Sequence, residues 1–199
     1  MMVIYTASFG RRITPSNKQW PKTRMVCFSD IKPPEPWEWV KIDPSNEDPV
    51  RSAKLPKILP WLFIDEWDES LWIDCNMVIK KLPSPKDDIA FHQHRSRKCI
   101  FKEAHVCISK GKDDKEIIEN QMERYKNFPI NNGLWEGGLI YRRNTDKIKA
   151  LCEDWMDEID NGSRRDQLSL PVVLDRHRIV PANLGPGGKH SLWVKEDKK

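Results

Sequence analysis

The feature that most constrains the fold is the alternation of short apolar runs with longer amphipathic segments. The runs "MVIYTASF" (2–9) and "RMVCFSD" (24–30) are rich in β-branched and aromatic residues and have the length of strands. Between residues 145 and 162, apolar side chains instead recur at helical spacing, and Gly162 marks the end of the predicted helix. Strands that alternate with helices favour an α/β fold with a mostly parallel, mixed sheet.

The other segments continue this alternation. Residues 71–73 and 133–143 have strand character. The connector 31–49 contains several prolines, so it cannot form the interior of a helix. Four further helical segments are predicted: 50–63, broken near Pro56 or Pro60, then 99–110, 113–128 and 164–174.

Length and composition indicate one folded domain. The chain has 199 residues, of which 38% are hydrophobic, and it must bury nine Trp and six Phe side chains. We expect a single domain over residues 1–195 and a frayed, charged tail at 196–199. The net charge of +4 is small for 34 basic and 30 acidic residues, so it supports an anionic ligand only where basic residues cluster.

The cysteines and the N-terminal segment indicate in which cellular compartment the protein is expected. Five cysteines form an odd set without CxxC spacing, which argues against a zinc ribbon and against a complete disulfide framework. We interpret them as reduced thiols of a cytoplasmic protein, in a bacterium or an infected host cell. The N-terminus lacks a basic region followed by a long apolar run, and no window of about 18 apolar residues occurs. We therefore expect neither a signal peptide nor a membrane anchor.

The run "SLWIDCN" (70–76) carries the first candidate site. A buried strand ends here in Asp74, and a carboxylate at the end of an apolar strand is costly unless it is paired. Strand alternation would place Asp74 and Asn76 on one side, where their oxygens suit Mg²⁺ or Mn²⁺ on a substrate diphosphate. The alternative, which spacing alone does not exclude, is that Asp74 caps the following turn.

A second candidate is the basic segment "HQHRSRK" (92–98). Arg95 and Arg97 present planar guanidinium groups, which match pairs of phosphate oxygens. The alternative is a basic surface turn. His92 and His94 are spaced like neighbours on one face of a strand, which would suit a metal, but the sequence offers no further ligands for them.

Three segments, "SLWIDCN", "HQHRSRKCIFKEA" and "RRDQLSL", occur in order at intervals that resemble a known family. It is a glycosyltransferase-like family with plant members implicated in pectin and mucilage synthesis and with bacterial and phage members. The resemblance extends from Val3 to Leu170 and includes "YTASFG", "VCFSD" and "RSAKLPKILP". It implies a three-layer GT-A fold, in which an Asp-x-Asp motif holds a divalent metal on a nucleotide-sugar. Here Asn76 replaces the second carboxylate, so it would supply an oxygen but no charge.

The resemblance also implies roles for later residues. Glu136, before two glycines, corresponds to a region that often faces the sugars in GT-A enzymes, which makes it a candidate acceptor-side base. A solvated glutamate in a β-bulge is the alternative. Asp166 and Gln167 resemble an Asp-Gln element near the donor sugar, and Asp166 could hold hydroxyls or act as the base. Helix capping by Asp166 and a surface position for Gln167 are the alternatives.

The two ends of the matched region complete the implied donor site. In "GGKHS", Lys189 would reach the diphosphate and His190 the metal, unless this segment is simply a frayed tail. Near the first strands, Asp30 would bind the base or ribose, or would cap the strand end. The residues that would receive the nucleotide at the end of the first strand are Thr6, Ala7 and Ser8.

The sequence therefore predicts a metal-dependent glycosyltransferase that moves a sugar from a nucleotide donor, a UDP-sugar first among them, to a hydroxyl. Two acceptors stay open: a hydroxymethylated pyrimidine in phage DNA, and a precursor of a cell-surface glycan. Two other function classes also stay open. One is a non-catalytic nucleic-acid-binding module that uses the basic and Trp residues. The other is a metal-dependent phosphoesterase. The sugar, the stereochemistry and the oligomeric state are not predicted.

Overall fold

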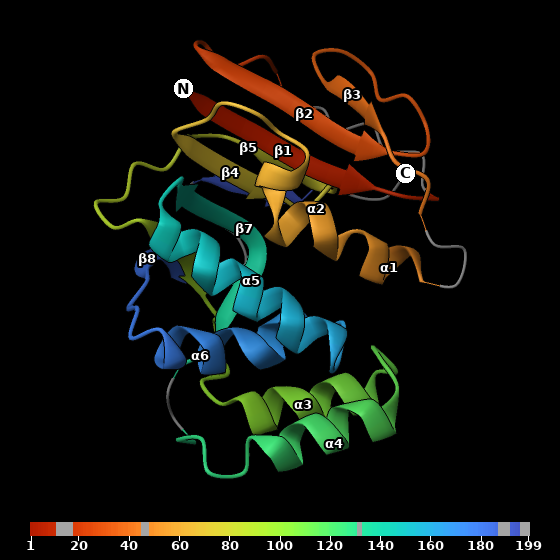
Figure 1. Ribbon diagram of the computed structural model, residues 1–199, viewed down its shortest axis with the longest axis vertical. Helices are drawn as coiled ribbons and strands as arrows, with labels where there is room; N and C mark the ends of the chain where they lie inside the picture. The colour runs from red at the N-terminus through yellow and green to blue at the C-terminus, as the bar shows by residue number, and fades with distance from the viewer. Residues whose placement is uncertain (11–17, 45–47, 131–132, 187–191, 196–199) are drawn as a thin grey trace.

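The computed structural model describes residues 1–10, 18–44, 48–130, 133–186 and 192–195. Within these residues, a seven-stranded sheet has the order β3-β2-β1-β4-β7-β6-β8, and β5 pairs with β9 in a separate small sheet (Figure 1). The strands are β1 (Met2–Ser8), β2 (Thr23–Ser29), β3 (Glu38–Lys41), β4 (Glu69–Ile73), β5 (Met77–Ile79), β6 (Ile89–Gln93), β7 (Trp135–Arg143), β8 (Ala182–Pro186) and β9 (Trp193–Lys195). The helices are α1 (Pro49–Ser52), α2 (Lys54–Ile58), the short 3₁₀ helix η1 (Pro60–Leu62), α3 (Ile100–Ser109), α4 (Lys115–Arg124), α5 (Asp146–Asp160) and α6 (Asp166–Arg176).

The main sheet is mixed and mostly parallel, which confirms the predicted α/β class. Strand β1 pairs in parallel with β2 and β4, β2 with β3, and β6 with β8, while β7 runs antiparallel to both β4 and β6. The four predicted strands correspond to β1, β2, β4 and β7. Strands β3, β6 and β8 were not predicted. β3 is a short edge strand inside the proline-rich connector, and β6 has only five residues.

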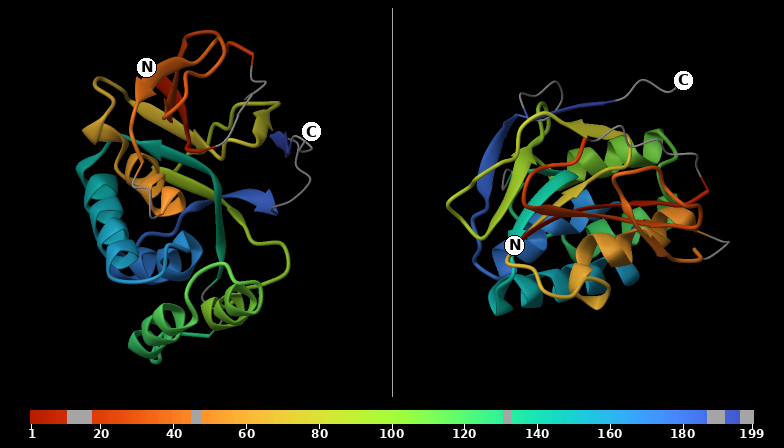
Figure 2. Two further views of the ribbon diagram at one scale, coloured as in Figure 1. Left: turned by 90° about the vertical axis from the view of Figure 1, so that its right-hand side faces the viewer. Right: turned by 90° about the horizontal axis from the view of Figure 1, so that it is seen from above.

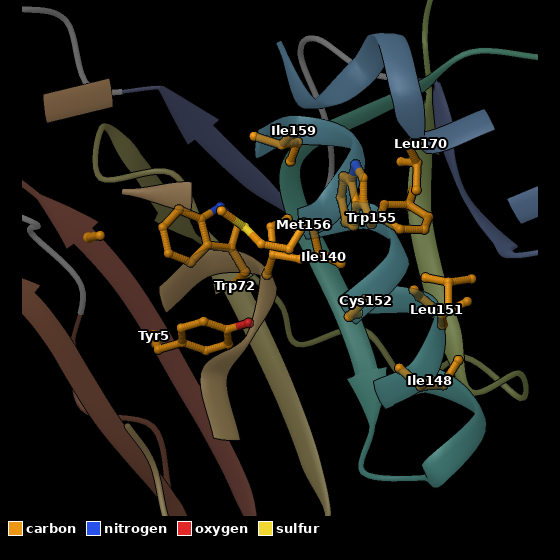
Figure 3. Packing of buried hydrophobic residues seen from close by; sticks show 14 of the residues in the cluster. Tyr5, Trp72, Ile140, Ile148, Leu151, Cys152, Trp155, Met156, Ile159 and Leu170 are labelled. Atoms are coloured by element: carbon orange, nitrogen blue, oxygen red, sulfur yellow. The ribbon is translucent and has the colours of Figure 1, made fainter. Parts of the chain in front are cut away.

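One face of the sheet is covered by α2, α5 and α6. The helical periodicity between residues 145 and 162 is confirmed as α5, whose Thr145 hydroxyl accepts a hydrogen bond from the Ile148 N–H at the helix start. Figure 3 shows the apolar side of α5, including the fully buried Trp155, against side chains from the sheet such as Ile140. Every predicted apolar position of α5 is buried, because this stripe faces the sheet.

The opposite face of the sheet is covered differently from the layering that the family resemblance implied. Its apolar side chains pack against Trp37, Trp193 and the small β5–β9 sheet, so in the described part of the chain this layer consists of strands and connectors, not helices (Figure 2). Helices α3 and α4 form a hairpin at one end of the molecule, where α3 also packs on α6 (Figure 1).

The predicted helix at 50–63 is divided into α1, α2 and η1. The interruptions lie at Ala53 and at Leu59, which adjoins the predicted break point Pro60, and the helix is not broken at Pro56. Pro56 is tolerated because it occupies the first turn of α2, where a backbone N–H would have no partner within the helix. This division matters for the site, because it directs two lysines of α2 toward the end of the sheet.

All five cysteines are thiols, and four of them are buried. In the part of the chain that the structure describes, no helix combines the length and the apolar character needed to cross a membrane.

Candidate functional site

A cleft of about 850 Å³ opens where β1 and β4 end. Its walls come from α1, α2, α3, the first residues of α6 and the start of β7, so segments far apart in the sequence meet there. Ligands of α/β proteins commonly bind at the carboxyl ends of parallel strands. The cleft is therefore the candidate functional site. The predicted site residues that line it are Ala7, Ser8, Asp74, Asn76, Arg97, Glu136, Asp166 and Gln167.

Asp74 and Asn76 reach the cleft through a tight turn. The Met77 N–H donates to the Asp74 carbonyl at 2.9 Å, so the chain reverses immediately after β4 and strand alternation does not apply to Asn76. Both residues nevertheless line the cleft. The reasoning that placed them on one side was wrong, but the juxtaposition it predicted is present.

The Asp74 carboxylate is held by residues outside that turn. Its Oδ1 accepts a hydrogen bond from Trp72 Nε1 at 3.1 Å and lies 3.7 Å from Lys57 Nζ. Its Oδ2 lies beside Gly138, where an added Cβ would come within 3.3 Å of that oxygen. One oxygen is thus engaged by the protein, and the other lies against backbone without a bulky side chain.

Asp166 forms the buried centre of the site. It is the first residue of α6 and only 4% exposed. Its Oδ2 lies 2.6 Å from Lys57 Nζ and 3.2 Å from Lys54 Nζ, and both lysine side chains are buried. Burial disfavours the charged carboxylate, but the two lysines and Arg165 outweigh it and hold the pKa of Asp166 well below its usual range. Asp166 is therefore a permanent carboxylate at neutral pH.

The two lysines of α2 complete this network. Lys57 lies between Asp166 and Asp74, so one ammonium group connects the two carboxylates. Burial lowers the pKa of Lys54 to about 8, although the charge of Asp166 opposes that shift. Because Lys54 and Lys57 are three residues apart on a helix, they project from one face. Only the fold brings that face to Asp166, more than a hundred residues later in the chain.

Hydrogen bonds from buried residues of the sheet fix the backbone position of Lys57. The Tyr5 hydroxyl donates to the Lys57 carbonyl at 3.0 Å, and the fully buried Arg142 donates to the same hydroxyl at 2.6 Å. The Tyr5 ring also packs edge-on against Trp72, with ring centroids 5.4 Å apart (Figure 3). Trp72 in turn holds Asp74. The core of the sheet therefore orients both ends of the lysine–carboxylate network.

Glu136 lies in an irregular part of β7. Along β6, Phe91 faces Ile140 but the next residue, His92, faces Glu136, so β7 carries extra residues at this point. The β-bulge that the alternative interpretation assumed is therefore present, but Glu136 is half-buried there and lines the cleft. Bulges commonly redirect a side chain next to a functional site.

The two glycines after Glu136 leave room for the carboxylates. A Cβ on Gly137 would lie 2.8 Å from Asp166 Oδ2 and 3.1 Å from Lys57 Nζ, which is too close for any larger residue without displacement. Gln167 lies nearby: its Nε2 donates to the Trp135 carbonyl at 3.2 Å, and its Oε1 accepts from Arg165 at the same distance. Gln167 is thus fixed at the cleft and does not lie freely on a helix surface.

The basic segment at 92–98 is divided by the fold. Arg97 lines the cleft, where its Nε binds Glu103 of α3 and its Nη2 lies 2.8 Å from His94 Nε2. His94 Nδ1 accepts hydrogen bonds from the backbone N–H groups of Ser96 and Arg97. Burial, together with the positive charge of Arg97, lowers the pKa of His94. Arg95 is exposed and does not line the cleft.

The two histidines do not form a pair. His92 is 1% exposed, and its Nε2 accepts a hydrogen bond from Trp193 Nε1 at 3.0 Å, whereas His94 faces the cleft. The irregular register between β6 and β7 at this point breaks the strand alternation that the spacing assumed. Among the residues described, no group of three His, Cys, Asp or Glu side chains gathers in a way that would hold a metal.

Four further predicted residues are placed outside the cleft lining or outside the described chain. Thr6 is fully buried within β1. Asp30 accepts hydrogen bonds from the Gly10 N–H, with the shorter contact at 3.0 Å, and so braces the end of β1 beside the cleft. Lys189 and His190 lie outside the described residues.

Sequence reasoning also missed charged residues of the cleft: Lys54, Lys57, Glu103, Lys110, Lys112 and Arg165. The spacing of Lys54 and Lys57 was the available signal, because residues three apart in a helix share a face. Arg165 adjoins the predicted Asp166, but its neighbour Arg164 has the same side chain and pairs with Asp48 at 3.0 Å instead. Only the structure distinguishes the two arginines.

Comparison with known proteins adds a family match over most of this cleft. Residues 35–185 match the protein family described as "TOD1/MUCI70, glycosyltransferase-like domain", and this range includes Asp74, Glu136 and Asp166. A curated protein of Arabidopsis thaliana, "Probable hexosyltransferase MUCI70", is 27% identical over 148 residues, which cover 65% of this chain. Those residues cover 26% of the plant protein, so the chain spans about a quarter of that relative's length.

Proposed function

Because the chain belongs to the TOD1/MUCI70 glycosyltransferase-like domain family, we propose that it transfers a sugar from a nucleotide diphosphate donor, with UDP-sugars first among the candidates, to a hydroxyl acceptor. The mostly parallel mixed sheet, with its cleft at the ends of β1 and β4, supports a GT-A-like arrangement. One observation carries the proposal. Three carboxylates in different surroundings, Asp74, Glu136 and Asp166, meet in this single cleft.

Asp74 and Asn76 are the proposed protein ligands of a divalent metal. A carboxylate and an amide are hard oxygen donors, and Mg²⁺ or Mn²⁺ bound to a nucleotide typically takes few ligands from the protein and several from the phosphates. The Asp74 oxygen beside Gly138 is consistent with this role, because the other oxygen already binds Trp72. When bound, the metal would offset charge on the departing diphosphate. Arg97 lines the same cleft and is the proposed guanidinium ligand of the phosphates.

Asp166 is better suited to holding the donor sugar than to accepting a proton. A general base works best when its pKa lies near the working pH, and the lysines keep the pKa of Asp166 far below that. A permanently charged carboxylate accepts hydrogen bonds from sugar hydroxyls. Lys57, 2.6 Å away, can donate to the same sugar.

Glu136 is the proposed acceptor-side base. It is half-buried in the bulge of β7, and the glycines that follow it allow a ligand to approach the backbone closely. During transfer, the bond between the anomeric carbon and the diphosphate oxygen breaks and a bond to the acceptor oxygen forms. Glu136 would take the proton that the acceptor hydroxyl loses. The buried lysines and the metal would stabilise negative charge near the leaving group.

The test is metal-dependent binding of the donor nucleotide. Calorimetric titration of the protein with UDP, with and without Mn²⁺, should show binding that depends on the metal. Asp74→Ala should abolish that dependence. Asp87→Ala, which removes an exposed carboxylate outside the cleft, should bind like the wild type. Thermal melting of both variants controls for folding. Unchanged Mn²⁺-dependent binding in Asp74→Ala would remove the central assignment.

A further inference from the structure

The cleft has two sides of opposite charge. We call one side the strand side, because it lies at the ends of the strands and includes the residues of α2 and α6 that face them. Its charged residues are three carboxylates and two lysines: Asp74, Glu136, Asp166, Lys54 and Lys57. The α3 side is formed from the other end of the molecule, and α5 and α6 lie between α2 and α3 (Figure 1). Its charged residues are Arg97, Glu103, Lys110, Lys112 and Arg165. Four of these are cations and one is a carboxylate, so this side carries an excess of three positive charges.

From this asymmetry we infer that the acceptor is an acidic glycan, whose carboxylate or phosphate group binds Lys110, Lys112 and Arg165 on the α3 side. The inference rests on the proposed function, because it assumes that the donor sugar binds at Asp166 and that the donor phosphates reach Arg97, which leaves Lys110, Lys112 and Arg165 to the acceptor. The negative strand side suits a divalent metal and sugar hydroxyls, whereas the α3 side suits an anion. Charge of one sign lining a cleft concentrates ligands of the opposite sign.

The Arg97–Glu103 pair is not counted among the acceptor ligands. Glu103 is 4% exposed and binds Arg97 Nε, so these two charges largely cancel each other. Apart from this pair, the charged residues of the α3 side are Lys110, Lys112 and Arg165, and the charge of Arg165 also acts on Asp166, whose pKa it helps to lower. The excess of positive charge on the α3 side therefore comes mainly from the two lysines, while Arg165 interacts with both sides of the cleft.

The backbone holds the two lysines at the rim of the cleft. After α3 ends, Gly111 adopts a left-handed conformation with φ of 54°, and the Lys112 N–H donates to the Cys107 carbonyl at 2.9 Å. Arg164 donates to the Lys112 carbonyl at 3.2 Å. Lysines near a helix C-terminus also interact favourably with the helix dipole. That explains their place in the sequence, but not why both line the same cleft as Arg165.

Arg165 offers a donor inside the cleft. Its Nη2 binds Gln167, while its Nε is buried and has no hydrogen-bond partner among the described residues. A buried donor without a partner costs free energy, which a ligand oxygen would recover. Arg165 adjoins Asp166, so an anion bound there would lie next to the proposed donor sugar.

The size of this cationic group favours a glycan over nucleic acid. Proteins that bind DNA tightly neutralise about six to ten phosphates, which requires a track of cations over an extended surface. Here three cations gather inside one cleft. The charges on and just after the neighbouring α4 are paired instead, such as Lys115 with Glu119 and Lys126 with Glu123. The arrangement resembles a pocket for one or two anionic groups.

The experiment compares matched acceptor probes in the presence of UDP and Mg²⁺. The probes are methyl glucuronide, its neutral methyl ester, and methyl glucoside 6-phosphate, with binding followed by ligand-observed NMR. The wild type should bind at least one acidic probe roughly tenfold more tightly than the ester. Which acidic probe binds distinguishes a carboxylate from a phosphate. The double variant Lys110→Gln/Lys112→Gln should lose that preference and keep its affinity for UDP.

Controls separate this inference from the proposed function. Lys115→Gln/Lys126→Gln removes two exposed lysines outside the cleft, one at the start of α4 and one just after its end, and should behave like the wild type. If UDP binding is normal but no acidic probe binds better than the ester, the acceptor assignment is wrong and the donor site stands. If UDP itself does not bind, both fail. Glucosylation of hydroxymethylcytosine DNA without any preference for acidic sugars would also overturn the inference, in favour of a nucleic acid acceptor.

Discussion

The lysine–carboxylate network makes a sharp prediction for Asp166→Asn. The substitution keeps the size and shape of the side chain but removes the charge that faces Lys54 and Lys57. All three side chains are less than 10% exposed, so solvent would screen the unpaired lysines poorly. Breaking a buried ion pair by removing one partner costs roughly 3–5 kcal/mol. For a chain of 199 residues this corresponds to a fall in melting temperature of roughly 7–12 °C.

The loss should depend on pH in a defined direction. In the wild type, the low pKa of Asp166 means that its contribution is present above the unfolded value of about 3.9 and disappears only in strong acid. Lys54 has a folded pKa of about 8, below the unfolded value of about 10.4, so the unfolded chain binds more protons between these values and stability rises with pH there. Without Asp166 the pKa of Lys54 falls further. The difference in free energy of unfolding between the wild type and Asp166→Asn should therefore be largest near pH 7 and become smaller toward pH 10.

The assay is thermal unfolding followed by circular dichroism at pH 7 and at pH 10. The control is Asp157→Asn, an exposed position on α5 that should change the free energy of unfolding by less than about 0.5 kcal/mol. Asp166→Asn melting at the same temperature as the control would show that the network does not hold a charged carboxylate. An equal deficit at both pH values would show that the lysines are not the cause.

Three other outcomes are expected. Gly137→Ala should weaken binding of a UDP-sugar more than binding of UDP in calorimetry, because the new Cβ displaces Asp166; equal losses would contradict a sugar-binding role. Arg97→Ala should lower the melting temperature more than Arg95→Ala, because it leaves the buried Glu103 unpaired, and should weaken UDP more than uridine. Equal melting temperatures, or equal losses for UDP and uridine, would argue against these roles. A strong reductant should leave the melting temperature unchanged, whereas a marked fall would reveal a structural disulfide.

Several features of the fold follow from local sequence patterns. Strands β1, β2, β4 and β7 could be predicted because a buried strand needs a continuous or alternating apolar stretch. Helix α5 could be predicted because its buried apolar residues repeat at the helical period. Short strands such as β3 and β6 lack either signal, since their position depends on pairing with strands elsewhere in the chain.

The candidate site divides in the same way. The sequence by itself determined that Asp74 ends a buried strand and that Asp166 begins a helix. Apolar patterns and the residues that start or end an element depend only on residues close by in the sequence. Only the tertiary structure decided that Lys57 lies between these two carboxylates, and that Arg97 binds Glu103 while Arg95 faces solvent. An ion pair depends on which side chains the packed sheet and helices bring within a few ångströms, and no local pattern encodes that distance.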